Sequence, residues 1–210
     1  MVNFVIEPSK TALLVTDMQN VFVEGSPVSA PEGPQVLDRL NRLAGFCHEV
    51  GIQVIYTAHL VRPDHTNVGV LGTIMPPVQS GMIDDGGAPG SLHAGVRMRE
   101  GDVLLKKPRY GAFQGTDLEL ILRGKGIDTL IIGGIATNVC CETTAREATV
   151  RDFKVIFLSD GTATLALPDQ GFGGPVATQD LQRVTCSVIN FFFGQVLTVN
   201  QVIEKIRTQQ

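Results

Sequence analysis

The stretch that decides the fold is Thr129-Leu130-Ile131-Ile132-Gly133-Gly134-Ile135-Ala136-Thr137-Asn138-Val139-Cys140-Cys141-Glu142-Thr143-Thr144-Ala145-Arg146-Glu147-Ala148. The apolar run at its start predicts a buried strand, the two glycines predict a tight turn, and the residues after them predict a helix. We expect Thr137 and Asn138 to cap this helix, because their side-chain oxygens can accept hydrogen bonds from the unpaired amides of a first turn.

Cys140 then lies in the first turn of the predicted helix. The helix dipole and the free amides favour a negative charge there, so we expect the thiol to ionise more easily than in water. The same amides could hold an oxyanion beside the sulfur. A free cysteine is also commonly a small buried apolar residue, and this stretch alone does not decide between nucleophile and packing.

Strands and helices alternate on both sides of this stretch. Apolar runs predict strands at 11–17, 52–57, 103–106, 154–159 and 195–197, and periodic apolar positions predict helices at 34–50, 117–123, 181–193 and 200–206. This alternation predicts an α/β fold with a doubly wound, mostly parallel sheet and helices on both faces. The helix at 181–193 has a largely apolar surface, so we expect it to be buried, in a subunit contact of a homo-oligomer.

Residues 60–100 interrupt the pattern. They are rich in Gly, Pro and Asp, and their one helical signal lies near 92–98. A long irregular segment in a compact domain is usually functional or mobile, so we interpret this one as a lid or a pocket wall. The alternative is a tolerated surface insertion, and the sequence does not distinguish it from a lid or pocket wall.

Three segments resemble a known family. Gly134–Ala148 resembles the motif G-(I/V)-A-T-x-x-C-V-E-x-T-A-R-x-A of the isochorismatase-like hydrolase superfamily, in its cysteine hydrolase branch. Leu14–Asn20 resembles the family segment L-(L/V)-x-x-D-(M/x)-Q-N, and Lys107–Phe113 resembles K-x-x-Y-S-A-F. The resemblance covers nearly the whole chain and implies a Rossmann-like fold.

The resemblance also implies a catalytic triad of Asp17, Lys107 and Cys140. It selects Lys107 over the adjacent Lys106, and it selects Cys140 over Cys141, which stands where the family usually has Val and which we expect to be a packing residue. All three candidates follow the carboxyl ends of predicted strands, and open α/β sheets place their sites at that edge. If the strands at 11–17 and 129–132 are neighbours, Asp17 and Cys140 converge there.

Further features of the site also follow from the resemblance. The backbone amides of Ala136 and Cys140 would form an oxyanion hole, and the peptide bond between Ile135 and Ala136 would be cis. Phe22 and Phe113 would form walls of the substrate pocket. Gly111 replaces the usual Ser of the third segment, which would loosen that turn.

We expect neither a cofactor nor a metal. The chain has no G-x-G-x-x-G and no G-x-x-x-x-G-K-[ST] element. His59, Asp64 and His65 could suggest a metal site, but the D-x-H element of the nicotinamidase relatives has Thr57 in place of its Asp. We interpret His59 as a residue that lines the pocket or forms a hydrogen bond.

The composition limits the partners. The 210 residues fit one domain spanning 1–210, and their net charge of −4 without a basic block argues against nucleic acid and anionic membranes. The first seven residues lack the basic and apolar regions of a signal peptide, and the four cysteines show no C-x-x-C spacing. We therefore expect a cytoplasmic protein that acts on a small molecule.

The interpretation is a cysteine amidohydrolase that cleaves a small non-peptide C–N bond in a linear amide, ureido or carbamoyl compound. Asp17 would take the proton of Cys140, Lys107 would keep Asp17 ionised, and a thioester would form with release of ammonia or an amine. The alternatives are a nicotinamidase-type hydrolase, an isochorismatase-type hydrolase that cleaves a vinyl ether, and a non-catalytic interaction protein on the same fold.

Overall fold

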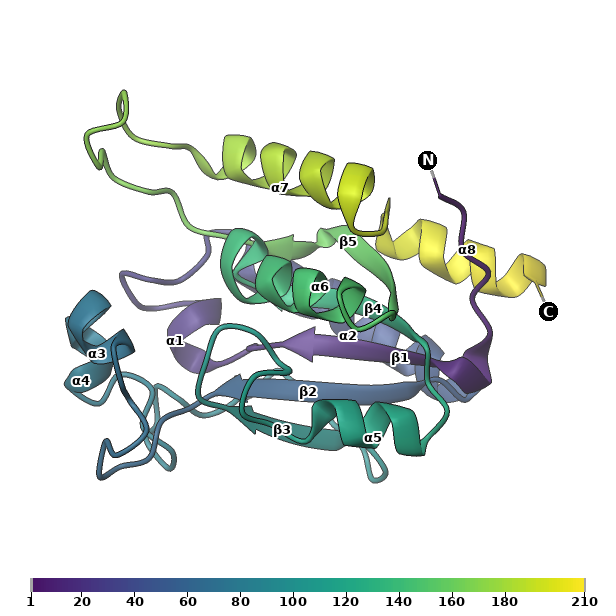
Figure 1. The fold of residues 1–210 in the computed structure, drawn as a ribbon, viewed down its shortest axis with the longest axis horizontal. Coiled ribbons are helices and arrows are strands. Elements are labelled where there is room, and N and C mark those ends of the chain that lie inside the picture. Colours follow the sequence, from purple (N-terminus) through teal and green to yellow (C-terminus); the bar gives the residue numbers. More distant parts are fainter. Residues whose placement is uncertain (1, 210) are drawn as a thin grey trace.

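The structure is a computed structural model that describes residues 2–209. Its sheet has six strands, all parallel, in the order β3-β2-β1-β4-β5-β6 (Figure 1). The strands are β1 (Thr11–Thr16), β2 (Gln53–His59), β3 (Val103–Lys107), β4 (Thr129–Ile135), β5 (Lys154–Ala163) and β6 (Gln195–Leu197). The α/β fold predicted from the alternation is confirmed.

The helices connect the strands as expected of a doubly wound sheet. They are α1 (Asn20–Val23), α2 (Gly33–Val50), α3 (Leu71–Ile74), α4 (Pro76–Gln79), α5 (Leu118–Gly124), α6 (Glu142–Thr149), α7 (Thr178–Phe192) and α8 (Val199–Gln209). A 3₁₀ turn, η1 (Pro8–Lys10), precedes β1, and a π-helical turn, η2 (Thr137–Cys141), joins β4 to α6. In Figure 1, α5, α6 and α7 lie in front of the sheet and α2 lies behind it.

Both faces of the sheet are buried, which explains why its strands read as continuous apolar runs. Along β1, Leu13 and Val15 join a core cluster with α2 and α8, whereas Ala12 and Leu14 join a second cluster with α5 and α6. This alternation is the period of two that a strand imposes on successive side chains.

The strand order reverses between β1 and β4, which are neighbours in the sheet. Thr16 pairs with Gly134 at the end of this contact. Gly134 has a φ of 130°, and a Cβ on it would lie 2.0 Å from the carbonyl oxygen of Thr16. Only glycine fits here, so the glycines of the deciding stretch let β4 end tightly against β1 at the point where open sheets bind ligands.

The segment between β2 and β3 packs with α1 around a small separate core at the carboxyl edge of the sheet. This third cluster comprises Val21, Val61, Val68, Leu71, Val78 and Ile83. The helical signal near 92–98 does not correspond to a helix, because backbone groups there pair elsewhere: Leu92 bridges to Gln19, and the amide of His93 donates to the carbonyl of Met18. The segment is thereby tied to the loop that follows β1.

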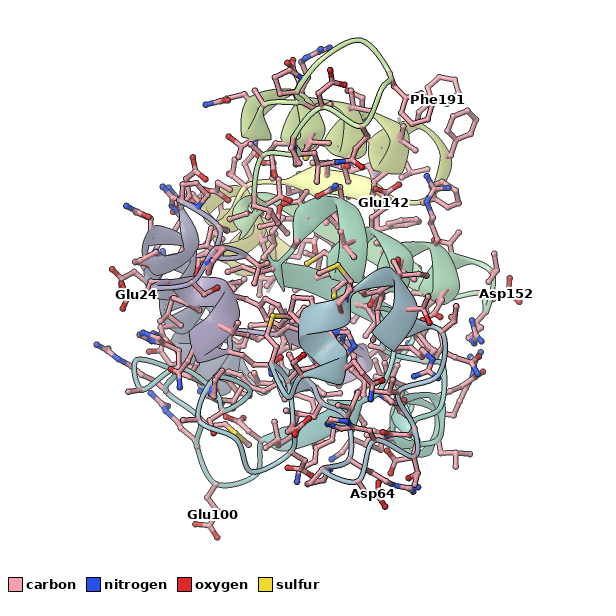
Figure 2. All side chains as sticks on the ribbon, turned by 90° about the vertical axis from the view of Figure 1, so that its left-hand side faces the viewer. Glu24, Asp64, Glu100, Glu142, Asp152 and Phe191 are labelled. Carbon is pink, nitrogen blue, oxygen red and sulfur yellow. The ribbon has the colours of Figure 1, made fainter. Side chains whose placement is uncertain are left out.

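The helix expected to be buried in a subunit contact is α7, which leaves part of its apolar surface exposed in the single chain. Thr185 and Ile189 are its buried residues, whereas Phe191 and Phe192 are exposed, and Figure 2 shows Phe191 pointing away from the body of the protein. The homo-oligomer stays a prediction. None of the helices in the described chain is both long and apolar enough to cross a membrane.

Candidate active site

Asp17, Lys107 and Cys140 meet at the carboxyl edge of the sheet, which faces the viewer in Figure 2. Asp17 follows β1, Lys107 ends β3 and Cys140 lies in η2 after β4. The Lys107 ammonium nitrogen lies 2.7 Å from Oδ2 of Asp17, and both side chains are fully buried. Cys140 is 6% exposed. The parallel sheet thus brings together three residues that are far apart in the sequence.

Thr57 on β2 orients the Asp17 carboxylate. Its hydroxyl donates to Oδ1 of Asp17 at 2.6 Å, and the Asp17 amide faces the Thr57 carbonyl at 3.2 Å. Asp17 adopts a positive φ of 51°, so these contacts hold a backbone conformation that few non-glycine residues adopt. Sequence reasoning noted Thr57 for the missing metal ligand and missed this orienting role.

Lys107 stays charged in its buried position. Its ammonium donates to the carbonyls of Arg109 and Tyr110 at 3.1 and 2.9 Å. Burial alone would lower the pKa of Lys107, but the Asp17 carboxylate and the Cys140 sulfur outweigh it and raise the pKa above its ordinary value. Lys106 points elsewhere and pairs with Asp85.

The turn that carries Cys140 is held by side chains rather than capped by them. The hydroxyl of Thr137 donates to Gln182 of α7, and the amide oxygen of Asn138 accepts from the hydroxyl of Thr164. The expected capping by Thr137 and Asn138 is therefore wrong, because both side chains bind elements outside the helix.

A second anchor joins the cysteine turn to the lysine loop. The hydroxyl of Thr144 donates to the carbonyl of Cys140 at 2.7 Å and accepts from the amide of Ala112 at 3.1 Å. One threonine side chain therefore links the segment after β4 to the loop after β3, so the positions of Cys140 and Lys107 are coupled.

The Cys140 thiol differs from the expectation of easy ionisation. Burial raises its pKa to about 12, although the Lys107 ammonium lowers it and a hydrogen bond with the Ala136 backbone lowers it further. In this state the thiol is protonated, and a base must take its proton before the sulfur can attack. Cys141 is fully buried in the core, in agreement with a packing role, and burial raises its pKa as well.

The peptide bond between Ile135 and Ala136 is cis, as the resemblance implied. Ala136 immediately precedes η2, and its backbone faces the Cys140 sulfur. The Ala136 amide expected in the oxyanion hole therefore lies beside the sulfur, and its role stays a prediction.

His59 is a further member of the site. It ends β2, is 3% exposed and packs edge-on against the ring of Tyr110, with the ring centroids 5.6 Å apart. Asp17, His59 and Cys140 each have one side-chain atom that could bind a metal, and these three atoms lie within 4.8 Å of one another. The interpretation of His59 as a pocket-lining residue agrees with this position, but the sequence carried no signal for its distance from the sulfur.

Within residues 2–209, a possible metal-binding group consists of these same three residues. Sulfur, imidazole and carboxylate donors suit zinc. However, the Lys107 ammonium already pairs with Asp17, and it would repel a dication placed there. The ligand set of the nicotinamidase relatives does not fit either, because Thr57 replaces its Asp and His65 pairs with Asp84 at 2.9 Å.

The two expected pocket walls differ in position. Phe22 on α1 is partly buried between the α2 core and the third cluster, at the same edge as the triad. Phe113 is instead a core residue rather than a pocket wall. Its ring packs against Phe153 with centroids 5.7 Å apart, and the Arg151 guanidinium lies 5.0 Å from the ring centroid.

Gly111 does not loosen its turn as expected. A Cβ at this position would lie 2.2 Å from a carboxylate oxygen of Glu147, which fills the space and accepts from the amide of Phe113. A side chain on α6 therefore supports the loop that carries Lys107.

Known proteins resemble this chain over most of its length. The family model described as isochorismatase domain matches residues 11–186. The chain is 32% identical to the ureidoacrylate amidohydrolase RutB of Methylorubrum extorquens over 210 residues, which cover 90% of this chain and 79% of the relative. It is 32% identical to the isochorismatase of Bacillus subtilis over 167 residues, which cover 79% of this chain and 52% of that relative. A crystal structure of a cysteine hydrolase from Pseudomonas syringae pv. phaseolicola superposes on this structure with a TM-score of 0.95 and 34% sequence identity. The match covers 100% of this chain and 98% of that protein.

Proposed function

The chain belongs to the isochorismatase family, and from this premise we propose that it hydrolyses a C–N bond of a small linear amide, ureido or carbamoyl compound, with Cys140 as the nucleophile. The observation that carries the proposal is the buried Lys107–Asp17 ion pair beside the Cys140 sulfur. A relative named as an ureidoacrylate amidohydrolase supports the choice of bond, and a structural neighbour named as a cysteine hydrolase supports the choice of nucleophile.

Acylation starts from the protonated thiol. Asp17 takes the Cys140 proton as the sulfur attacks the carbonyl carbon, and the Lys107 charge favours the thiolate that forms. The amides of Ala136 and Cys140 bind the oxyanion. Asp17 then gives its proton to the departing nitrogen, the C–N bond breaks, and a thioester remains.

Deacylation uses the same groups in the opposite order. Asp17, ionised again, takes a proton from water as the water attacks the thioester, and the sulfur leaves as a thiol when Asp17 returns that proton. Thr57 keeps the carboxylate in one orientation through both steps by donating to Oδ1, so the oxygen that faces Lys107 and the sulfur stays the same.

The vinyl-ether alternative is less consistent with these residues. Hydrolysis of a vinyl ether requires no cysteine nucleophile. In this chain, however, the Cys140 sulfur, the Asp17 carboxylate and the His59 imidazole lie within 4.8 Å of one another. A non-catalytic scaffold would have no use for a buried charge pair that a hydrophobic pair could replace without loss of stability.

Release of ammonia from a panel of primary amides, ureas and carbamoyl compounds tests the proposal. We expect turnover of at least one linear compound by the wild type, and loss of that turnover in Cys140→Ser. A thioester intermediate should be trapped as a mass increase on the peptide that contains Cys140. Turnover of isochorismate with no release of ammonia from any compound would contradict the proposal.

A further inference from the structure

The Nε2 atom of His59 is buried and has no hydrogen-bond partner among the described residues. His59 is held firmly: its amide donates to the side-chain oxygen of Gln19 at 2.7 Å, and the Gln19 side-chain nitrogen donates back to its carbonyl at 3.1 Å. A buried polar atom is costly to leave unpaired, so a native structure that keeps one at its reaction centre points to a partner that arrives with the ligand.

This nitrogen is an acceptor. Burial, together with the Lys107 charge, lowers the pKa of His59 to about 4, so the ring is neutral near pH 7. A neutral imidazole carries one N–H, and the Pro108 backbone, whose carbonyl can only accept, favours a proton on the ring. Because Nε2 has no partner among the described residues, we assign the N–H to Nδ1 and the lone pair to Nε2.

The position of the ring relates it to the leaving group. In amide hydrolysis the carbonyl carbon must lie beside the Cys140 sulfur, and the departing nitrogen must lie beside Asp17, which protonates it. A ring nitrogen of His59 lies within 4.8 Å of both the Cys140 sulfur and an Asp17 carboxylate oxygen, so the ring borders the space between the two groups that act on the scissile bond.

We propose that Nε2 of His59 accepts a hydrogen bond from the leaving nitrogen of the substrate, and that this bond makes the site selective for amide and ureido bonds over esters. The inference rests on the proposed function and names the group that sets its bond selectivity. His59 takes no proton in the reaction: the S–C bond forms, the C–N bond breaks, its electron pair goes to nitrogen, and the proton that nitrogen gains comes from Cys140 through Asp17.

An ester would be disfavoured because its leaving oxygen carries no hydrogen. Its lone pairs would face the lone pair of Nε2, so the histidine would remain unpaired in the transition state. Sites built to bind an N–H or O–H group reject analogues that lack it for this reason.

The test measures kcat/KM for an amide and an ester with the same acyl group. In His59→Leu, which removes the acceptor, we expect the amide-to-ester ratio to fall by about 10- to 100-fold, the usual scale for one hydrogen bond to a reacting group. His59→Gln keeps an acceptor oxygen and should recover part of the ratio. His48→Gln is the matched control, because His48 pairs with Asp102 away from the triad and its change should leave the ratio unaltered.

Each outcome has one meaning. An equal fall in kcat/KM for amide and ester in His59→Leu would show a packing role, and unchanged kcat/KM values for both substrates would show no role, so both results would overturn the inference while the proposed function stands. A wild type that hydrolyses the ester and none of the amides would instead overturn the proposed function and its selectivity together.

Discussion

The Lys107 ammonium lies 2.7 Å from the Asp17 carboxylate, and neither side chain has any contact with solvent. Lys107 ends the edge strand β3 and Asp17 follows β1, so the pair spans β2. Removing one member of a buried ion pair leaves an uncompensated charge, which typically costs about 3–5 kcal/mol. The site is therefore held in place by the same interaction that the chemistry requires.

Asp17→Asn and Lys107→Met should each lower both stability and turnover. We expect kcat to fall by at least about 10²-fold, the usual scale for acid–base catalysis, and the free energy of unfolding to fall by about 3–5 kcal/mol. The double variant should recover most of the stability and none of the activity, because it removes both charges. Urea unfolding and steady-state kinetics measure the two effects; near-wild-type turnover in Asp17→Asn would contradict the triad.

Alkylation by iodoacetamide should be slow at Cys140 in the free protein at pH 7. The sequence alone predicted a thiol that ionises more easily than in water, but burial raises the Cys140 pKa to about 12. Because the thiolate fraction rises tenfold per pH unit below the pKa, the labelling rate should rise steeply from pH 7 to pH 10. Cys186, which is partly exposed, should label first in peptide mapping. Rapid labelling of Cys140 at pH 6 would show that the thiol ionises more easily than its burial implies.

The pattern of strands and helices could be predicted because it is a local property of the sequence. Apolar runs such as Leu13–Val15 occur because both faces of the sheet are buried. The convergence of Asp17 with Cys140 follows from the neighbouring positions of β1 and β4 in the sheet. The sequence pattern therefore specified which edge of the sheet holds the candidate residues.

The electrostatics of the site could not be predicted because they depend on distant segments. The pKa of Cys140 follows from burial by several elements, and the role of Thr57 follows from its register beside β1. Phe113 was expected to form a wall of the pocket, but contacts with Phe153 and Arg151 place its ring in the core. Such contacts between remote residues have no local signature.

His59 should destabilise the protein in acid. Its pKa is lowered from 6.5 to about 4 by burial, so the unfolded chain binds a proton that the folded protein refuses. The stability is fully present above pH 6.5 and falls as the pH drops, until below about pH 4 the loss is on the order of 3 kcal/mol. His59→Gln should flatten this part of the curve of unfolding free energy against pH. An identical acid slope in the variant would assign the loss to other groups.

Activity should survive exhaustive chelation. The Lys107 ammonium neutralises Asp17, and Thr57 replaces the Asp of the D-x-H element, so the site lacks a complete ligand set of the nicotinamidase kind. The measurement is turnover after dialysis against EDTA, with metal content determined on the same sample. Loss of activity that zinc or iron restores would show that His59 and its neighbours bind a required metal.

A linear carbamoyl or ureido compound should be a better substrate than nicotinamide. Nicotinamidase relatives use a metal to bind the pyridine nitrogen, and this chain lacks the Asp of that ligand set. The aromatic wall expected from Phe113 is also missing, because that ring packs in the core. What remains near the sulfur is a buried acceptor at His59 and the side chains of Asp17 and Tyr110, a setting for a compact group rich in N–H. The comparison is kcat/KM for nicotinamide against an ureidoacrylate-like compound and a simple carbamoyl compound. A nicotinamide value tenfold above every linear candidate would refute this choice of substrate, while the roles of Cys140 and Asp17 would remain open to the kinetic tests above.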